Sequence, residues 1–280
     1  MTYNEFKATA ITKLSSITDN ARFETDTLIT HFSGMKKNEF LMKRANEIPD
    51  DIYQKLDKAL ERRMNHEPLQ YIIGEWEFFG LRIFCGEGCL IPRPETELLA
   101  ELAIKYLPRN GLLLDLCTGS GCVPIAVLNN RPDVRAIAVD VSEKALSYAK
   151  KNAEYHGISE SRLRLVKSDV YEYTPSVFPD MITSNPPYIK SDDIKGLSEE
   201  VLHEPSIALD GGHDGLDFYK VIVKNIVSKY LKDDGYCAVE VGYDIGREVA
   251  AIFKSQRFDA KIIRDMFEVE RICLAKRSRL

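Results

Sequence analysis

The sequence lacks the cysteine and histidine patterns that are typical of metal sites and of disulfide-bonded secreted domains. None of its 6 cysteines forms a Cys-x-x-Cys pair, and none of its 5 histidines belongs to a His-Glu-x-x-His motif. Cys237 and Cys273 lie inside apolar runs, as buried core thiols do. We therefore expect no bound metal and free cysteines, which fits a reducing compartment.

The sequence also has no excess of positive charge and no long apolar run. Its formal net charge of -5 argues against a broad surface for nucleic acid, which needs a basic face. The basic clusters Lys36-Lys37, Lys43-Arg44 and Lys276–Arg279 are better explained as solvated surface. Because no signal peptide opens the chain and no stretch is long and apolar enough to span a bilayer, we expect a cytoplasmic protein that needs no membrane.

What the sequence does contain divides it into three parts. Residues 1–72 show only helical patterns, with apolar side chains at helical spacing in segments such as 19–32 and 49–60. Between positions 75 and 84, aromatic and aliphatic residues flank Gly80, which predicts a β-hairpin. We therefore expect an N-terminal helical bundle over 1–72, a β-hairpin linker over 73–94 and a larger domain over 95–280.

Strand and helix patterns alternate through the third part. Short apolar runs at 112–116, 135–140, 162–167, 180–185 and 236–241 are separated by helical patterns. Ser142 is placed to cap the helix that follows it, and Gly157 is placed to end that helix. An apolar stripe from Tyr219 to Leu231 predicts a second, long helix. Segments 260–264 and 269–276 close the chain as an antiparallel pair. The pattern predicts an α/β fold with a doubly wound, mostly parallel sheet.

A glycine-rich turn follows the first of these strands. The run Leu112–Leu116 leads into Cys117-Thr118-Gly119-Ser120-Gly121, and a helical pattern begins at Cys122. Such a turn directs backbone amides and a helix N-terminus at a ligand. The next strand ends in Asp140, where an acid is placed to bind ribose hydroxyls.

Two ligand classes compete for this turn. A nicotinamide dinucleotide requires Gly-x-Gly-x-x-Gly, but Pro124 stands where the third glycine belongs. S-adenosylmethionine (AdoMet) needs only a floor of small residues and acids for its hydroxyls, which Asp115, Gly119, Gly121 and Asp140 provide. A glycine turn without a ligand is a third explanation, because a single glycine motif is a weak signal.

The tetrapeptide Asn185-Pro186-Pro187-Tyr188 ends a later apolar run. Neither proline can donate to a sheet ladder, so the strand stops there and Asn185 is held at its carboxyl end. The Asn185 amide oxygen and the Pro186 carbonyl can each accept an N–H from a substrate amide or nucleobase amine. Alone, this tetrapeptide is better explained as a plain strand-ending turn. Following the glycine turn and Asp140, it indicates a methyl-transfer site.

With these motifs, the sequence resembles the class I AdoMet-dependent methyltransferases and, among them, the PrmC/HemK family that methylates glutamine N5 in peptide chain release factors. The matching blocks are Pro68–Gly74, Glu77–Gly80, Ile91–Glu97, Asp115–Gly121, Asn152-Ala153, Asn185–Tyr188, Glu204-Pro205, Ala208–Gly212 and Asp214–Leu216. Asn-Pro-Pro-Tyr alone is shared with DNA and RNA amine methyltransferases. The Ile-Pro-Arg-Pro-Glu-Thr-Glu and Gly-Gly-x-Asp-Gly-Leu blocks narrow the resemblance to glutamine methylation.

The resemblance implies a seven-stranded Rossmann-like methyltransferase sheet, a small helical domain that docks substrate, and a monomer. It implies AdoMet as methyl donor, S-adenosylhomocysteine as product, a release factor as protein partner and no direct need for nucleic acid. The residues expected to bind AdoMet are Asp115, Cys117, Thr118, Gly119, Ser120, Gly121, Asp140, Val141, Asp169, Val170 and Asn185. Position 117 departs from the family, which often has glycine there.

The expected chemistry is transfer of a methyl group to the side-chain amide nitrogen of the glutamine in a Gly-Gly-Gln motif. Asn185, Pro186 and Tyr188 are the expected catalytic residues, and Pro187 and Glu95 are expected to contact substrate with them. Glu95 and Glu97 have two equally good explanations: they close the site from the linker, or they favour a helix N-terminus electrostatically. The alternatives are a DNA or RNA exocyclic-amine methyltransferase, a ribosomal-protein glutamine methyltransferase and a non-catalytic AdoMet-binding adaptor.

Overall fold

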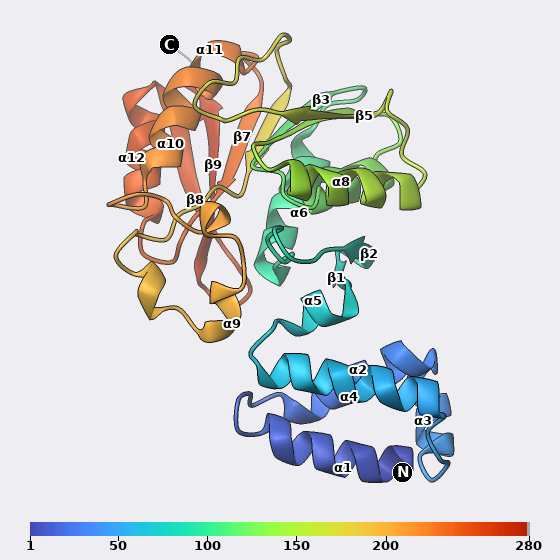
Figure 1. Ribbon diagram of the computed structural model, residues 1–280. Coiled ribbons are helices and arrows are strands. Elements are labelled where there is room, and N and C mark those ends of the chain that lie inside the picture. The colour runs from blue at the N-terminus through green and yellow to red at the C-terminus, as the bar shows by residue number, and fades with distance from the viewer. Residues whose placement is uncertain (279–280) are drawn as a thin grey trace. The chain divides into compact units, whose positions relative to one another are not determined.

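A computed structural model describes residues 1–278, which form two compact units (Figure 1). The first unit consists of residues 1–75 together with Ser198–His203. The second consists of residues 76–197 and of the chain from Glu204 onward. The sequence patterns gave no indication that Ser198–His203 belongs with the N-terminal helices.

The first unit is built from helices. They are α1 (Tyr3–Leu14), α2 (Ala21–Ser33), α3 (Lys37–Lys43), α4 (Asp50–Met64), α5 (Leu69–Ile73) and α9 (Glu199–Leu202). At the start of α1, the Thr2 hydroxyl accepts from the Glu5 N–H and the Glu5 carboxylate accepts from the Thr2 N–H, which satisfies two free helix donors. The αL conformation of Gly34 ends α2, as the sequence predicts.

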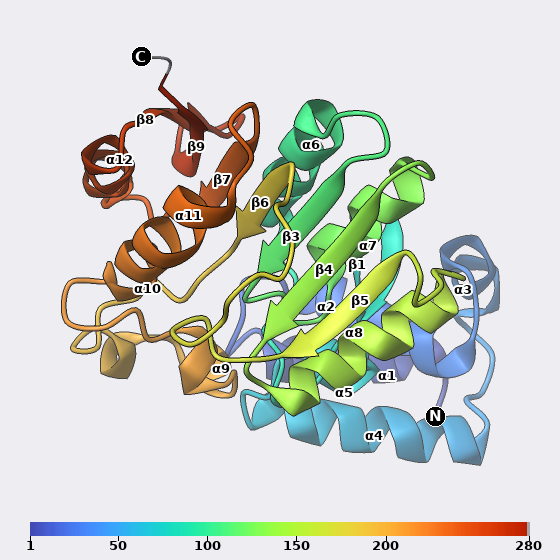
Figure 2. The ribbon, with the colours of Figure 1, turned by 90° about the horizontal axis from the view of Figure 1, so that it is seen from above.

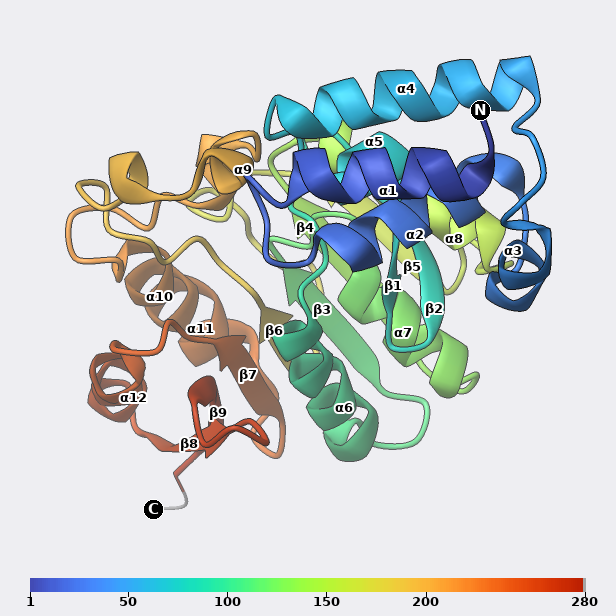
Figure 3. The same ribbon diagram turned by 90° about the horizontal axis from the view of Figure 1, so that it is seen from below.

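The core of this unit lies between α1, α2 and α4 (Figure 3). Leu14, Leu28, Ile29 and Leu56 are completely buried there. Arg63 is buried as well: its Nε donates to Glu24 Oε2 at 2.6 Å, and its Nη2 donates to Glu200 Oε2 at 2.8 Å. A buried guanidinium needs such partners, so this ion-pair network attaches α9 to α4.

A two-stranded hairpin follows, made of β1 (Glu75–Phe78) and β2 (Leu81–Phe84). Its two-residue turn has positive φ at both Phe79 (54°) and Gly80 (70°), the backbone of a type I′ hairpin turn. Glu97 Oε1 accepts the Phe79 N–H at 2.8 Å. Glu97 therefore stabilises the hairpin turn. The sequence had suggested other roles for it, closing the site or favouring a helix N-terminus, and not this contact.

The second unit contains a seven-stranded sheet (Figure 2). Its strands are β3 (Leu112–Leu116), β4 (Arg135–Asp140), β5 (Leu163–Lys167), β6 (Met181–Ser184), β7 (Tyr236–Glu240), β8 (Phe258–Arg264) and β9 (Glu270–Arg277). They are ordered β5-β4-β3-β6-β7-β9-β8. Only β9 runs antiparallel to its neighbours β7 and β8. The predicted α/β class and mostly parallel sheet are confirmed.

Helices cover both faces of this sheet. One apolar core joins it to α6 (Glu97–Tyr106), α7 (Cys122–Asn130) and α8 (Glu143–Tyr155), and another joins it to α10 (Asp217–Val221) and α12 (Gly246–Ser255). Ser142 caps α8 by accepting the Ala145 N–H, as predicted. The long helix predicted after Tyr219 is interrupted, since a π-helical segment (Ile222–Val227) separates α10 from α11 (Ser228–Tyr230). Four apolar side chains of that segment are buried against the sheet.

Within residues 1–278, no helix combines the length and the apolar composition needed to cross a lipid bilayer.

Candidate active site

A pocket lies at the carboxyl ends of the neighbouring strands β5, β4, β3 and β6. The chain runs from β3 outward to β4 and β5 and then returns to the other side of β3 as β6. Ligands bind at this kind of switch point in open α/β sheets. Among the predicted site residues, those that line the pocket are Asp115, Cys117, Thr118, Gly119, Ser120, Asp140, Val141, Asp169, Val170, Asn185 and Pro187.

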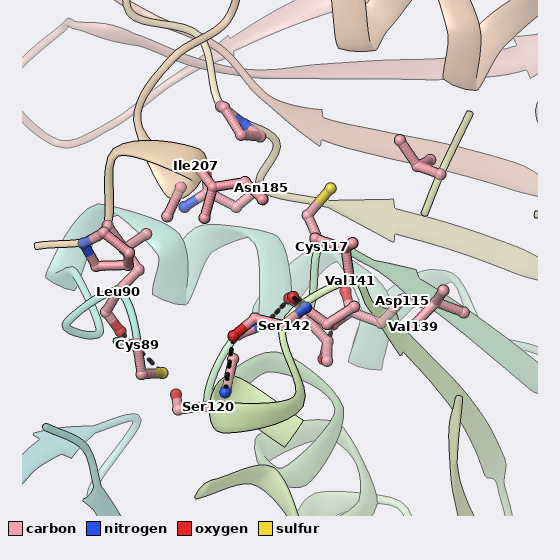
Figure 4. Close-up of a pocket in the computed structure, with 18 of the residues that line it drawn as sticks. Cys89, Leu90, Asp115, Cys117, Ser120, Val139, Val141, Ser142, Asn185 and Ile207 are labelled. Carbon is pink, nitrogen blue, oxygen red and sulfur yellow. Dashed lines mark hydrogen bonds between the residues drawn. The ribbon is translucent and has the colours of Figure 1, made fainter. Parts of the chain in front are cut away.

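The glycine-rich turn forms one wall of the pocket (Figure 4). Its backbone is left-handed at Cys117 (φ 56°), Gly119 (φ 55°) and Gly121 (φ 75°). A Cβ built at Gly119 would meet no protein atom, so the space beside this residue is open. The positive φ at Cys117 explains why glycine suits that position, since an L-residue there is strained.

Asp115 lies under this wall at the end of β3. Its buried carboxylate accepts from the Thr118 hydroxyl at 2.5 Å and from the Thr183 hydroxyl at 2.6 Å. Burial raises the pKa of Asp115 to about 7, because desolvation disfavours the charged form more than the two hydroxyls favour it. Asp115 is thus a carboxyl that changes charge near neutral pH within a ligand pocket.

Asp140 and Asp169 follow the two neighbouring strands. Asp140 accepts the Gly119 N–H at 2.8 Å and the Ser142 N–H at 2.9 Å, and burial raises its pKa. Each of its oxygens retains a second lone pair for a ligand hydroxyl. Asp169 is exposed and accepts the Tyr171 N–H at 2.9 Å. Val141, 40% exposed although apolar, adds a contact surface at the same end of the sheet.

Four predicted site residues do not line the pocket: Gly121, Pro186, Tyr188 and Glu95. Gly121 precedes α7, and a Cβ there would come within 3.1 Å of the Ala149 side chain on α8, so its role is close helix packing. Pro186 is buried, and Tyr188 is partly buried and packs against the core beside α10. Glu95 lies in the 3-10 turn Pro94–Thr96 before α6.

The side chain of Asn185 is held by a hydrogen bond from its nitrogen. Nδ2 donates to Thr96 Oγ1 at 3.2 Å, and the Thr96 hydroxyl donates to Glu240 Oε2 at 2.7 Å. Asn185 and Thr96 both line the pocket, whereas Glu240 is buried at the end of β7. This arrangement leaves the carboxamide oxygen of Asn185 to accept a hydrogen bond from a ligand.

The backbone after Asn185 is held by the glycine-containing loop Leu209–Gly215. The Ile189 N–H donates to the Leu209 carbonyl, and the Gly211 N–H donates back to the Ile189 carbonyl. A Cβ at Gly211 would lie 2.6 Å from the Tyr188 Cα, and one at Gly215 would lie 2.5 Å from the Tyr188 carbonyl oxygen. Both glycines therefore allow a close approach that fixes the Asn-Pro-Pro-Tyr turn.

Several pocket residues were not assigned from the sequence. They are Gly88–Arg93, Thr96, Cys122, Val123, Val139, Ser142, Ala145, Ser168, Tyr171, Pro205, Ile207, Ala208 and Phe218. Figure 4 shows Cys89 and Leu90 from one of these segments and Ile207 from another, together with Asn185. Buried Glu204 connects the two segments, because its carboxylate accepts the Ile91 N–H at 2.9 Å and pairs with Arg93. Only some of these residues lie in the sequence blocks shared with the family, which was the one signal that could have indicated them: Ile91, Pro92, Arg93, Thr96, Pro205 and Ala208.

Tyr171 and Phe218 add aromatic surface to the pocket. Their rings are 5.5 Å apart and meet edge to face at 71°. Such a pair can pack against a planar ligand group. Within the part of the chain that the structure describes, no group of three or more His, Cys, Asp or Glu side chains is arranged to hold a metal ion.

Comparisons with known proteins identify the family of this chain. The family described as PrmC N-terminal domain matches residues 7–74, and the Methyltransferase small domain matches residues 94–214. The chain is 35% identical to a release factor glutamine methyltransferase of Thermodesulfovibrio yellowstonii, with 96% of this chain and 99% of that protein covered. It is 36% identical to one of Neisseria gonorrhoeae, over 91% and 93% of the two chains. A solved methyltransferase from Pyrococcus furiosus has the same fold, with a TM-score of 0.53, 17% identity and coverage of 71% and 89%.

Proposed function

Because the chain belongs to the family of release factor glutamine methyltransferases, we propose that it methylates the side-chain amide nitrogen of the Gly-Gly-Gln glutamine in a peptide chain release factor, with AdoMet as donor. The single observation that carries the proposal is the orientation of Asn185. Its Nδ2 is bonded to Thr96, so its oxygen is available to accept an N–H from the substrate amide.

The pocket suits AdoMet better than a dinucleotide on chemical grounds. Three carboxyls, Asp115, Asp140 and Asp169, line it, so it attracts a cationic ligand and disfavours a pyrophosphate. The open floor at Gly119 leaves room for the methionine part, and Asp140 is placed for ribose hydroxyls. When bound, AdoMet supplies a methyl group on a positively charged sulfur, which makes that carbon electrophilic.

The protein's contribution is to orient a weakly nucleophilic nitrogen. An amide nitrogen shares its lone pair with the carbonyl, so it attacks poorly unless both N–H groups are held. Asn185 Oδ1 and the Pro186 carbonyl would accept these two N–H groups and favour the positive charge that develops on nitrogen. Pro187 lines the pocket next to Asn185. Tyr188 and Glu95 lie outside the pocket lining, so they would contact the residues that flank the glutamine and not the reacting amide.

We propose further that the helical unit docks the release factor, and that the enzyme acts as a cytoplasmic monomer without direct contact to nucleic acid. Support for docking comes from the match of residues 7–74 to a family domain that accompanies this activity. Sedimentation of the free enzyme and of its mixture with a release factor would measure both the oligomeric state and the complex.

The direct test is transfer of a tritiated methyl group. The enzyme and labelled AdoMet are incubated with one of five samples. These are an unchanged release factor, the same factor with its Gly-Gly-Gln glutamine changed to alanine, ribosomal proteins, a nucleic-acid mixture, and buffer alone. We expect label only in the unchanged release factor. Label in nucleic acid or in ribosomal proteins instead would favour those alternatives, and AdoMet binding with no label anywhere would favour a non-catalytic adaptor.

Asn185→Ala tests the assignment of the acceptor. Since Asn185 is at a strand end and outside the apolar cores, the fold should be retained, and the other ten residues expected to bind AdoMet should hold it with little loss of affinity. Transfer should fall by about 10²–10³-fold, the usual effect of removing one preorganised polar group. Calorimetry of AdoMet binding beside the transfer assay separates the two effects, and transfer at the wild-type rate would refute the role of Asn185.

A further inference from the structure

We propose that Thr96 and Glu240 are positioning residues for methyl transfer, which act by determining which end of the Asn185 carboxamide faces the substrate. This inference rests on the proposed function, because it concerns how the same site holds a substrate amide. Neither residue was assigned from the sequence. Thr96 is 89 residues from Asn185 and 144 residues from Glu240, so only the fold brings them together.

Sheet register brings two of the three groups together. Strands β6 and β7 are parallel neighbours, with Ser184 paired to Val239. The next residues along the chain are Asn185, just after β6, and Glu240, the last residue of β7, so both lie at the same edge of the sheet. Thr96, in the 3-10 turn before α6, lies between their side chains and bonds to both. Thr96 and Glu240 are buried, which keeps water from replacing either hydrogen bond.

The direction of the hydrogen bonds follows from counting protons. A threonine hydroxyl has one proton, and an ionised carboxylate has none. When Glu240 is ionised, the Thr96 proton is used in the bond to Glu240, so Thr96 Oγ1 can only accept from Asn185. The carboxamide must then present Nδ2 to Thr96 and Oδ1 to the pocket.

The opposite orientation would be unproductive. If Glu240 were protonated, it could donate to Thr96, and the Thr96 proton could then bond to the Asn185 oxygen. The carboxamide would turn and present an NH₂ group to the substrate NH₂ group, so two donors would face each other. Thus the ionised state of Glu240 favours the acceptor orientation of Asn185, without Glu240 touching the substrate.

The surroundings of Glu240 place this change near neutral pH. Burial raises its pKa to about 7, the Thr96 hydroxyl opposes that rise, and Glu95 adds to it. The charges of Arg271 and Arg93 favour its ionised form. Burial raises the pKa of Tyr188, Tyr219 and Cys122, and the nearby Glu240 charge adds to that rise, so they stay neutral near pH 7. Methyl transfer at saturating AdoMet should therefore increase as pH rises through about 7.

The test compares four variants with the wild-type enzyme on a release factor. Thr96→Val keeps the side-chain shape and removes both hydrogen bonds, so kcat should fall by about 100-fold, as for a misplaced catalytic group, with little change in AdoMet affinity. Thr96→Ser keeps the hydroxyl and should recover most of the rate. Glu240→Gln should lower kcat and remove its rise with pH. Thr25→Val is the matched control, since Thr25 is a buried threonine with a hydrogen bond in α2, and its kcat should not change.

A second measurement does not depend on the substrate. The measurement is NMR of protein labelled with ¹⁵N-asparagine. The side-chain NH₂ signal of Asn185 is identified by its loss in Asn185→Asp. As pH is varied, this signal should shift with a midpoint near pH 7. Glu240→Gln and Thr96→Val should abolish that shift. If the wild-type enzyme methylates no release factor, the proposed function is refuted. The pH titration of the Asn185 signal still tests whether Thr96 and Glu240 control the orientation of Asn185. A wild-type kcat in Thr96→Val, or an Asn185 signal that does not respond to pH, would overturn the inference.

Discussion

At the scale of single residues, the sequence indicated which polar groups form the site but not how these groups contact one another. Asp115, Gly119, Asp140 and Asn185 were predicted because each lies at or just after the carboxyl end of a recognisable strand, and strand ends are local features of the sequence. Their contacts were not predictable in this way. The left-handed backbone at Cys117 was not predictable either, since no local sequence pattern indicates that an L-residue has positive φ.

Asp115 gives a prediction about pH. Its pKa is about 7 in the folded chain, against an ordinary value of 3.8. The folded protein therefore holds a proton that the unfolded chain releases, and this contribution to stability is complete below pH 4 and lost as pH rises through about 7. Asp115→Asn removes the titration. The difference in unfolding free energy between variant and wild type should shift in favour of the variant from pH 5 to pH 8, while AdoMet affinity falls.

Denaturant unfolding at several pH values measures the first effect, and calorimetry measures the second. Asp133→Asn is a useful comparison, because Arg131 lowers the pKa of this surface acid below its ordinary value of 3.8. Asp133 is therefore ionised in both the folded and the unfolded chain from pH 5 to pH 8, and the stability difference for Asp133→Asn should stay constant over that range. A stability difference for Asp115→Asn that stays constant across this pH range would contradict the prediction.

At the scale of elements, the strands and the helices that flank them were predictable, whereas the way loops pack was not. The five apolar runs and the closing antiparallel pair gave all seven strands of the sheet within two residues, because burial on both faces leaves a continuous hydrophobic signal. The interrupted helix after Tyr219 was missed, since its apolar stripe is equally compatible with an α-helix. The loop Leu209–Gly215 was noticed only as a shared block, and its packing on Tyr188 required the fold.

This loop gives a prediction at the element scale. Gly211→Ala would place a Cβ 2.6 Å from the Tyr188 Cα and 2.8 Å from the Pro187 carbonyl oxygen, both backbone atoms that cannot move alone. The turn that carries Asn185 should shift, so we expect kcat to fall by about 100-fold and stability by about 1–3 kcal/mol. Gly196→Ala is the control, since a Cβ there meets no atom within 4 Å. Equal effects of the two changes on kcat would show that the contact has no catalytic role.

At the scale of the whole molecule, the sequence indicated a helical part followed by a sheet-containing part but not the return of the chain to the first. Ser198–His203 belongs to the helical unit through Glu200, which pairs with Arg63 at a separation of 137 residues. Short exposed helices such as α9 have no apolar stripe, so nothing in their sequence states where they pack. The helical unit also exposes large apolar side chains, which are more common at interaction surfaces than elsewhere.

If the helical unit docks the release factor, its exposed apolar residues should affect affinity and not chemistry. Leu41 and Met42 on α3 are 54% and 75% exposed. Leu41→Ser/Met42→Ser should raise the KM for a full-length release factor by about 5- to 10-fold, corresponding to about 1 kcal/mol of lost contact, with kcat unchanged. The KM for a short Gly-Gly-Gln peptide should stay the same, because the peptide lacks the parts of the release factor that are proposed to contact the helical unit. Met266→Ser/Phe267→Ser is the matched control in the second unit, where these residues are 88% and 77% exposed. If the control pair raises the KM for the full-length factor and the α3 pair does not, docking belongs to the second unit.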